Sequence, residues 1–373
     1  MSKINLENTI NNSPYYFYFL VVDKFLDINI PQLKNFEKIY LSDYPSIKIK
    51  NSGKLLSNPK VIDYILKKYQ KSNLTPAIIS FKPSSKIDFL CKKYNWININ
   101  NPGPINRFLE DKIKFAKLCQ KYKLPIIPFS LDTFSQNNFL KYQKIYNQKL
   151  VIQTHFGWAG NSTFSSSSWK EISEKIPSNV LVKYSPFIGS SYSLLNNCCI
   201  TKFGLIQSPV ALQYTGIKPF TKNQFTTVGR QWPSFAPPKI IKNINKISED
   251  FSKIIKEIGY KGFFGLDFLI KDNQVFLLEC NPRLTASFAF YTKLELDQKI
   301  TPLFYFHLAE FLKLNYTINI KSEKSRFNNK KIIGSEITPK DKNNYTCKKL
   351  NFNYPLSKTT NPISIPKDLN EKN

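Results

Sequence analysis

The sequence contains little histidine and no paired cysteine motif. Only two histidines occur in 373 residues, and none of the six cysteines forms a CxxC pair. A zinc site needs several histidine or cysteine ligands at close spacing, so this composition argues against one. We expect reduced thiols and a cytoplasmic protein.

Long hydrophobic runs are also missing. The first apolar run, YYFYFLVV at 15–22, has eight residues, whereas a membrane-spanning helix needs about 20. No basic segment precedes this run, as a secretory signal would require. We therefore expect a strand here and no membrane interaction.

Arginine is scarce although the chain is strongly basic. Lys and Arg total 54 against 26 Asp and Glu, a net charge of +28, yet only four are arginine. Recognition of nucleic-acid bases and phosphates favours arginine, because its planar guanidinium can donate two parallel hydrogen bonds. The lysines are spread among Asn and Ile along the whole chain, so we expect no specific nucleic acid and an attraction for small anions. A basic nucleic-acid-binding protein stays as an alternative function.

The length and a hydrophobic content of 42% predict two or three domains or subdomains with real cores. The first hundred residues alternate strand patterns (15–22, 36–43, 76–81) with helix patterns (57–72 and 84–94). This βαβα order predicts a parallel sheet covered by helices. No GxGxxG follows the first strand, so a dinucleotide site of that kind is not indicated.

The segment NPGPINRF at 101–108 breaks this alternation and suggests a domain boundary. Further on, SEDFSKIIKEIGYKG at 248–262 predicts a helix capped by Ser248 and ended by Gly259. The tail from about 317 is polar, and we expect one strand near 330–337 and loose structure past 350.

Oxygen-bearing side chains interrupt a strong hairpin pattern, GLDFLIKDNQVFLLECNPR at 265–283. Because side chains alternate along strands, Asp267 on the first strand should lie on the same face as Glu279 and Asn281 on the second. Hard oxygen ligands of this kind suit Mg²⁺. On spacing alone, a sheet edge with the two acids paired to lysines is equally supported.

The hairpin resembles the metal-binding hairpin of ATP-grasp enzymes, in which an acid on one strand faces ExN or ExNxR on the next. EDKIKFAKLCQKYKLPIIP, LVIQTHFGWAGNSTF and VLVKYSPFIGSSYSL resemble, in the same order, the start of the small ATP-grasp subdomain, its phosphate loop and its adenine hinge. The resemblance implies an α/β chain: a parallel βαβ domain, then two α+β subdomains that grip ATP between them. The implied boundaries are 1–106 for the βαβ domain, 107–185 and 186–316 for the small and large subdomains, and 317–373 for a partly loose polar segment.

The resemblance also implies roles for individual residues. Asp267, Glu279 and Asn281 would hold one or two Mg²⁺ (or Mn²⁺) ions at the β- and γ-phosphates, and Arg283 would bind the substrate carboxylate or the acyl phosphate. The remaining nucleotide contacts would come from Lys112, Gln153, Gly157, Gly160, Asn161, Lys183, Tyr184 and Phe187. Many relatives carry a lysine at the position of Gln153. The glutamine therefore leaves the phosphate site of this chain with one positive charge fewer.

The chemistry implied is attack of a carboxylate on the γ-phosphate of Mg-ATP, then displacement of phosphate from the acyl phosphate by an amine or similar nucleophile. The substrates would be small molecules, and a homodimer is compatible with this interpretation. The sequence NPR at 281–283 resembles the carboxylase and carbamoyl-phosphate branch, so a carboxylase of that type is a second hypothesis.

Overall fold

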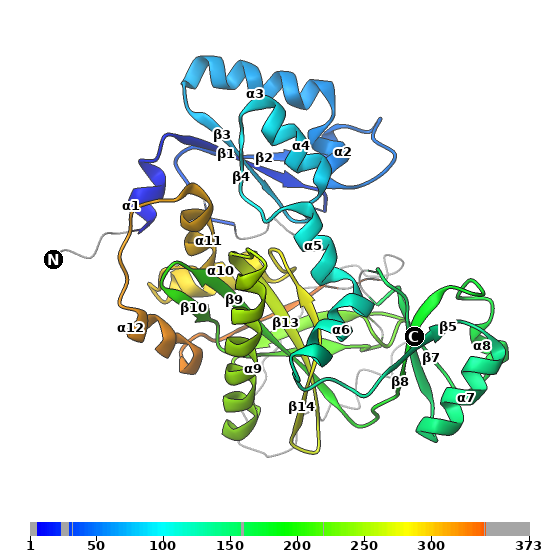
Figure 1. Ribbon diagram of the computed structural model, residues 1–373. Coiled ribbons are helices and arrows are strands. Elements are labelled where there is room, and N and C mark those ends of the chain that lie inside the picture. Colours follow the sequence, from blue (N-terminus) through cyan, green and yellow to red (C-terminus); the bar gives the residue numbers. More distant parts are fainter. Residues whose placement is uncertain are drawn as a thin grey trace, which may run out of the picture.

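The computed structural model describes residues 6–23, 30–31, 33–157, 160–218, 220–338 and 340. Within these ranges the strands form two sheets of four and one sheet of seven. In Figure 1 the N-terminal sheet lies above the seven-stranded sheet, and the third sheet lies to one side. The mixed α/β class is as predicted, with a parallel sheet near the N-terminus and antiparallel sheets elsewhere.

The N-terminal sheet is parallel, in the order β2-β1-β3-β4. The central strand is buried on both faces: Phe17 and Phe19 enter the core shared with the large sheet, and Tyr18 and Leu20 enter the core beneath α3 and α4. The predicted βαβα order is confirmed. The elements are α1 (Leu6–Asn11), β1 (Tyr15–Val21), β2 (Phe36–Tyr40), the 3₁₀ turn Leu41–Asp43, α2 (Ser52–Leu56), α3 (Pro59–Ser72), β3 (Thr75–Ser80), α4 (Ser85–Tyr94) and β4 (Ile97–Asn98).

Two helices occupy the segment after this sheet. They are α5 (Gly103–Glu110), where the sequence suggested a break, and α6 (Lys112–Lys121). Proline is tolerated in the first turn of a helix, so the proline and glycine of this stretch mark the start of α5. Asp111 separates the helices and caps α6, accepting hydrogen bonds from the N–H groups of Ile113 and Lys114.

The third sheet is small and antiparallel, in the order β5-β8-β6-β7. One face packs on a core that includes Phe134, Phe139, Ile152 and Tyr184. The other face, as described below, is a wall of the candidate site. The elements are β5 (Ser130–Thr133), α7 (Gln136–Tyr146), β6 (Leu150–Gln153), β7 (Thr163–Ser166), α8 (Trp169–Ile172) and β8 (Leu181–Pro186).

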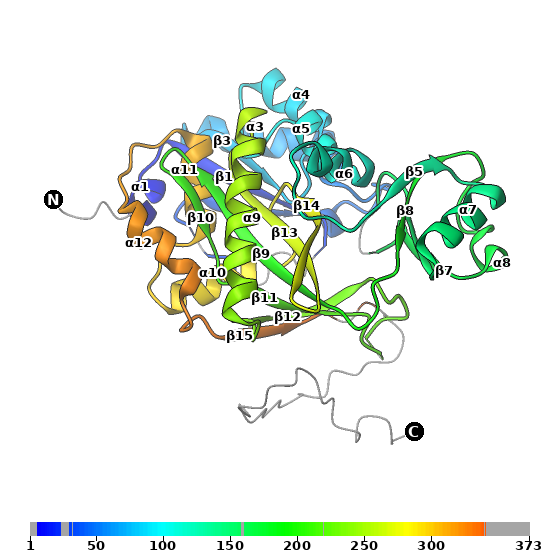
Figure 2. The same cartoon turned by 60° about the horizontal axis from the view of Figure 1, so that its bottom comes forward.

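The large sheet has the order β14-β13-β9-β11-β12-β15, with β10 also paired to β9. Figure 2 shows α9 (Pro238–Glu257) running along one face of this sheet. The strands are β9 (Tyr192–Thr201), β10 (Gly204–Gln207), β11 (Ala211–Thr215), β12 (Thr227–Trp232), β13 (Gly262–Lys271), β14 (Gln274–Asn281) and β15 (Gly334–Ile337). The other helical elements are α10 (Phe288–Asp297), α11 (Leu303–Leu312), α12 (Ile320–Ser325) and the 3₁₀ turn Arg326–Asn328.

The predicted start of α9 was wrong. The helix begins at Pro238, and Ser248 lies in its middle, where its hydroxyl donates to Asn196 Oδ1 at 3.0 Å. The hydrophobic period extends further upstream than the sequence analysis followed it, because Ile240, Ile244 and Ile247 are all buried. The prediction that Gly259 ends this helix is confirmed, since Gly259 follows the last turn with a left-handed φ of +84°.

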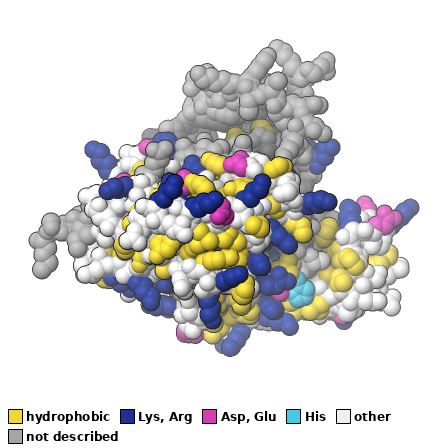
Figure 3. Space-filling view, turned by 90° about the horizontal axis from the view of Figure 1, so that it is seen from above, with side chains coloured by type: hydrophobic (Ala, Val, Ile, Leu, Met, Phe, Trp, Pro, Cys, Tyr) yellow, Lys and Arg dark blue, Asp and Glu magenta, His cyan; other side chains and the backbone are white. Residues whose placement is uncertain are grey.

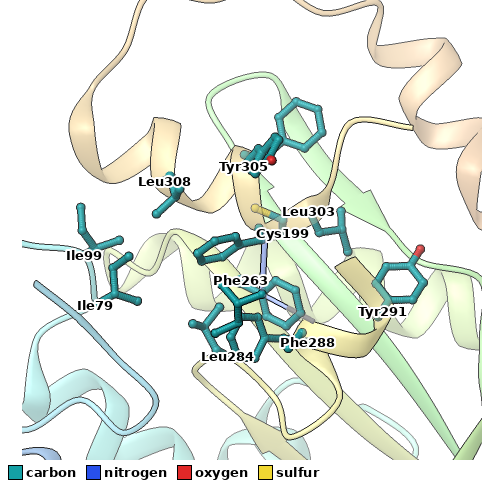
Figure 4. Close-up of a cluster of buried hydrophobic side chains, with 14 of the residues drawn as sticks. Ile79, Ile99, Cys199, Phe263, Leu284, Phe288, Tyr291, Leu303, Tyr305 and Leu308 are labelled. Atoms are coloured by element: carbon teal, nitrogen blue, oxygen red, sulfur yellow. The ribbon is translucent and has the colours of Figure 1, made fainter. Parts of the chain in front are cut away.

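One core joins the N-terminal sheet to the large sheet. Figure 4 shows Ile79 and Ile99 near Phe263 and Leu308, and all four belong to one buried cluster. His307 bridges the two parts: its Nδ1 accepts from the Phe263 N–H at 3.0 Å, and its Nε2 lies 3.1 Å from the Ile99 carbonyl. Burial lowers the pKa of His307 to about 3, which makes it a neutral structural histidine.

The polar tail contributes one strand to the described structure. The strand expected near 330–337 is β15, which pairs antiparallel with β12. The loose structure expected past 350 lies outside the described residues. Within the described ranges, no helix combines the length and apolar character that crossing a bilayer requires, and the five cysteines there are buried and unpaired.

Candidate active site

The hairpin of β13 and β14 brings the predicted carboxylates face to face. Asp267 pairs directly with Glu279 in the register, and Gly265 pairs with Asn281. A register shift follows Asp267, so the alternation that predicts a shared face holds at this end of the hairpin. The prediction that these side chains converge at one end of the hairpin is therefore confirmed.

Asp267 lies among neutral donors. Gln213 Nε2 donates to its Oδ1 at 2.7 Å, and Asn281 Nδ2 donates to its Oδ2 at 2.9 Å. Burial is the largest cause, and the charge of Glu279 the second largest, of a rise in the pKa of Asp267 to about 7. Neither amide carries charge, and the charge of Arg230 offsets the rise only in part. Among the described residues, Asp267 therefore has no hydrogen-bonded counter-ion.

Glu279 has a cationic partner. Lys112 Nζ lies 2.5 Å from its Oε2, although the two residues are 167 positions apart. Burial acts to raise the pKa of Glu279, but the contact with Lys112, together with Asp267 and the charge of Arg283, outweighs burial and lowers that pKa. The alternative interpretation, a sheet-edge acid paired to a lysine, is thus realised for Glu279 on edge strand β14. Asp267 on the inner strand β13 has no lysine among its hydrogen-bond partners.

Arg283 is fixed beside the hairpin by three kinds of contact. Its Nε donates to Glu110 Oε1 at 3.0 Å and its Nη2 donates to Asn281 Oδ1 at 3.0 Å. Its guanidinium also lies over the Phe81 ring, 4.4 Å from the centroid. The side chain is buried and held from both α5 and the end of β3, so its direction is set before any ligand arrives.

A cavity of about 480 Å³ lies between the hairpin and the small sheet. Alternation decides which residues of the small sheet reach it: Val151, Gln153, Lys183 and Ser185 line the cavity, whereas the residues between them enter the core on the other face. The predicted site residues that line it are Lys112, Gln153, Gly157, Gly160, Lys183, Phe187, Asp267, Glu279, Asn281 and Arg283.

Two predicted residues are not brought to this cavity. The Tyr184 side chain points into the core of the small sheet, where its ring stacks on Tyr142, and β8 is paired on both sides, so its backbone groups serve the sheet. Asn161 is exposed and does not line the cavity. Tyr184 fails because one position along a strand reverses the face.

The structure adds residues that the sequence analysis missed. Gln213 binds Asp267, and Thr227 donates to Gln213 Oε1 at 3.3 Å. Both line the cavity, as does Lys82 at the end of the N-terminal sheet. The one available signal was a polar glutamine inside the apolar strand ALQYT at 211–215, and such a residue is too common in strands to single out.

Two glycines frame the loop after β6. A Cβ at Gly157 would lie 2.0 Å from Ser162 Oγ, and Gly160 has φ of +81° with the Phe225 backbone 3.1 Å from a built Cβ. Residues 158 and 159 between them lie outside the described ranges. Glycine is required at both positions, by close approach at the first and by the left-handed backbone at the second.

The donor set at the hairpin fits a hard divalent cation. The described residues contain no group of three or more His, Cys, Asp and Glu side chains, so a third protein oxygen has to come from an amide. Asn281 offers such an oxygen, because its Oδ1 retains a lone pair beside the hydrogen bond from Arg283. Two carboxylates and one amide oxygen suit Mg²⁺, which keeps other positions for phosphate oxygens and water.

A comparison with protein families decides what kind of domain this is: the model of the ATP-grasp domain matches residues 109–287. These residues form an ATP-grasp domain. The match includes Lys112, the glycine loop, β8 and both strands of the hairpin, but no residue of the N-terminal sheet.

Solved structures show the same fold over most of the chain. Biotin carboxylase from Campylobacter jejuni, in an ATP complex, is 14% identical, with a TM-score of 0.61 over 81% of this chain and 72% of that one. N5-carboxyaminoimidazole synthetase from Staphylococcus aureus, complexed with ADP, is 13% identical, with a TM-score of 0.57 over 82% of this chain and 79% of that one. The ATP-grasp domain and the parallel sheet before it thus share the arrangement seen in these proteins.

One curated relative is more similar in sequence over a shorter stretch. An uncharacterised protein of Methanocaldococcus jannaschii is 31% identical over 120 residues, which is 28% of this chain and 30% of that protein. The chain therefore matches about a third of the length of this relative.

Proposed function

We propose that the protein is an ATP-dependent ligase that activates a carboxylate as an acyl phosphate and joins it to an amine or a similar nucleophile. One observation carries the proposal: Asp267 and Glu279 oppose each other at a cavity that also receives Lys112 and Lys183. Two carboxylates, an amide oxygen and two lysines at one end of one cavity suit a nucleotide's phosphates with a divalent cation.

The cavity has a place for each part of the nucleotide. Phe115, Ile126, Leu277 and Phe187 supply an apolar region for the base. The hairpin and the glycine loop line the same cavity and would meet the phosphates. A bound Mg²⁺ would neutralise charge on the β- and γ-phosphates as the γ-phosphoryl group is transferred.

In the first step a carboxylate oxygen of the substrate attacks the γ-phosphorus, the bond to the β,γ-bridging oxygen breaks, and ADP leaves. In the second step the nucleophile attacks the acyl carbon and phosphate departs, with loss of one proton from the nucleophile. Arg283, held by Glu110 and Asn281, would orient the carboxylate and stabilise charge on the acyl phosphate. Lys112 would exchange its contact with Glu279 for a phosphate oxygen.

A second candidate within the same chemistry uses bicarbonate as the carboxylate. It is favoured by the solved structures named above, which are carboxylases or N5-carboxyaminoimidazole synthetases, and by the sequence NPR at 281–283. The product of the first step would then be carboxyphosphate. A homodimer fits this candidate, since a biotin carboxylase domain from Hydrogenobacter thermophilus that shares the fold is described as a dimer. The buried reduced cysteines suit a cytoplasmic location.

The test measures ADP release from Mg-ATP with pools of carboxylates and amines and, separately, with bicarbonate. Hydroxylamine traps an acyl phosphate as a hydroxamate, so carboxylate-dependent hydroxamate supports the ligase, whereas ADP release that needs bicarbonate supports the carboxylase. The nucleic-acid alternative predicts salt-dependent binding to DNA or RNA without any effect of Mg-ATP on melting temperature. That result would overturn the proposal. Figure 3 shows Lys and Arg scattered among hydrophobic and neutral side chains on the face in view, which gives this alternative no concentrated basic patch there.

A further inference from the structure

The small sheet has a neutral residue where the resemblance to ATP-grasp enzymes leads one to expect a lysine. Gln153 lies at the end of β6, directly before the glycine loop, and its side chain lines the cavity. Its amide is already engaged, because Nε2 donates to Thr163 Oγ1 on β7 at 3.0 Å. Gln153 therefore brings no charge, and one of its two amide N–H groups is already committed to Thr163.

A lysine lies beside this position on the neighbouring strand. In the β6–β8 register Gln153 pairs directly with Lys183, so their side chains leave the same face of the sheet. Both line the cavity, and directly opposed residues of an antiparallel pair have Cβ atoms about 5 Å apart. A lysine side chain is longer than this separation, so Lys183 can deliver its ammonium to the space in front of Gln153.

Lys183 is also the less committed of the two lysines at this end of the cavity. Lys112 is bound to Glu279, whereas no hydrogen bond or ion pair joins the Lys183 ammonium to any residue in the described part of the chain. Burial is the largest cause, and the charge of Lys112 the second largest, of a fall in the pKa of Lys183 to about 8. A half-buried ammonium without a counter-ion is suited to bind an anion, because burying an unpaired charge is costly.

We propose that Lys183 is the phosphate-binding cation of the small sheet and replaces, from the adjacent strand, the charge that Gln153 lacks. Its ammonium would contact oxygens of the nucleotide phosphates, on the side of the cavity opposite the Asp267–Glu279 hairpin. The inference rests on the proposed nucleotide site and adds a side-chain role for β8, from which the sequence had suggested contacts to the adenine.

The experiment measures dissociation constants for Mg-ATP and for adenosine, which lacks phosphates, in Lys183→Met. We expect Mg-ATP to bind about 10- to 100-fold more weakly, the range for loss of one charge-assisted contact, and adenosine to bind unchanged. The matched control is Lys144→Met, an exposed lysine on α7 of the same subdomain, which should leave both constants as they are. Moving the charge back, in the double variant Gln153→Lys with Lys183→Gln, should restore most of the loss.

Three results would overturn the inference: unchanged Mg-ATP binding in Lys183→Met, an equal loss for adenosine, or no recovery in the double variant. An equal loss would assign Lys183 to the adenine end. Folding is monitored by melting temperature, which should not fall in Lys183→Met because the substitution removes an unpaired, half-buried charge. A failure of the proposed function itself is distinguishable, since the unaltered protein would then bind no Mg-ATP.

Discussion

Two groups of charged side chains in this protein differ in what surrounds them. The core ion-pair cluster consists of Glu295, Arg326 and Glu323. The cavity cluster consists of Asp267, Glu279, Asn281 and Lys112. Arg326 Nη1 lies 2.5 Å from Glu295 Oε1 and its Nη2 lies 2.5 Å from Glu323 Oε2, so one arginine serves two acids.

The core cluster is closed. Glu295 is fully buried, and its second oxygen accepts from the Leu303 N–H at 3.1 Å, so each carboxylate oxygen of Glu295 has a partner. The cavity cluster is open: its one lysine contacts Glu279 and not Asp267, and the Glu279 side chain, 38% exposed, lines the cavity. A perturbed carboxyl pKa does not separate the clusters, because burial raises the pKa of Glu295 to about 8 and that of Asp267 to about 7.

The comparison shows that buried charge and a shifted pKa are not sufficient signs of a functional site. What distinguishes the cavity cluster is an excess of acceptor oxygens beside a space large enough for a ligand. What distinguishes the core cluster is that both oxygens of its buried Glu295 are paired within the protein, which suits a structural role.

The largest expected effect separates the clusters by activity. Glu279→Gln should lower ATP turnover by about a thousandfold, because it removes a charged oxygen at the phosphate site, while the protein stays folded. Glu295→Gln should lower stability but leave turnover per folded molecule unchanged. Steady-state ADP release together with circular dichroism checks both. Normal turnover in Glu279→Gln would remove the hairpin from the mechanism.

The next effect is on stability. Arg326→Met leaves Glu295 buried without its partner and should lower the free energy of unfolding by about 3–5 kcal/mol. The control is Lys324→Met, since Lys324 is half exposed and its ion pair with Glu249 spans 3.6 Å. Urea denaturation measures both changes. Equal, small effects would show that the core cluster contributes no more than a surface pair.

A smaller effect concerns the stability of the fold at acid pH. It depends on His307, a second buried polar side chain whose ring nitrogens both have partners within the protein. Its pKa is lowered from 6.5 to about 3 in the folded protein, so its stabilising contribution is present above pH 6.5 and is lost as pH falls toward 3. The slope approaches about 1.4 kcal/mol per pH unit in this window. His307→Gln should remove this part of the slope in urea denaturation measured from pH 4 to 7.

The chain offers a matched control in its other histidine. His155 is partly exposed and contacts Asp111, so His155→Gln removes a histidine without touching the buried contacts of His307 and serves as the control. If both histidine variants showed the same slope as the unaltered protein, the buried neutral histidine would not account for acid sensitivity.

The smallest effect tests the loop over the open cluster. Gly160→Ala forces a Cβ into a left-handed backbone and should cost about 1 kcal/mol of stability, and it should also raise the KM for ATP. Gly259→Ala imposes the same backbone strain far from the cavity, with φ of +84° and only Ile105 Cδ1 near its Cβ. That control should lose stability with KM unchanged. A rise in KM in both variants would contradict a local role for the loop.

Local patterns predicted the parts of the molecule that depend on neighbouring residues. The hairpin followed from alternation about a short turn, and Asp267 and Glu279 are paired as expected. The contact of Lys112 with Glu279 joins residues 167 positions apart, and the pairing of Gln153 with Lys183 depends on β8 lying between β5 and β6. Strand order of this kind is set by the packing of whole sheets, so no single segment contains it.

The errors have physical causes as well. The start of helix α5 within 101–108 was not predicted, because Pro and Gly mark chain breaks as well as helix starts; the domain boundary suggested there stays a prediction. Ser248 has the chemistry of a helix cap, but tertiary contact with Asn196 satisfies its hydroxyl inside α9. Tyr184 was assigned to the nucleotide from an approximate alignment, and an offset of one residue in a strand exchanges core for cavity.

The strand β15 has a consequence for how this protein is handled. It covers the outer edge of β12, and Glu336 on it holds Arg230 at 3.1 Å across the pair. An uncovered edge strand offers free backbone groups to other molecules. Pairing with β15 therefore protects β12 from strand-to-strand aggregation. Shortened versions made for crystallisation should therefore keep the chain at least to Lys340, because Thr338 and Lys340 donate backbone hydrogen bonds to Val228 and Phe220. Cutting before β15 would uncover the edge of β12 and leave Arg230 without Glu336.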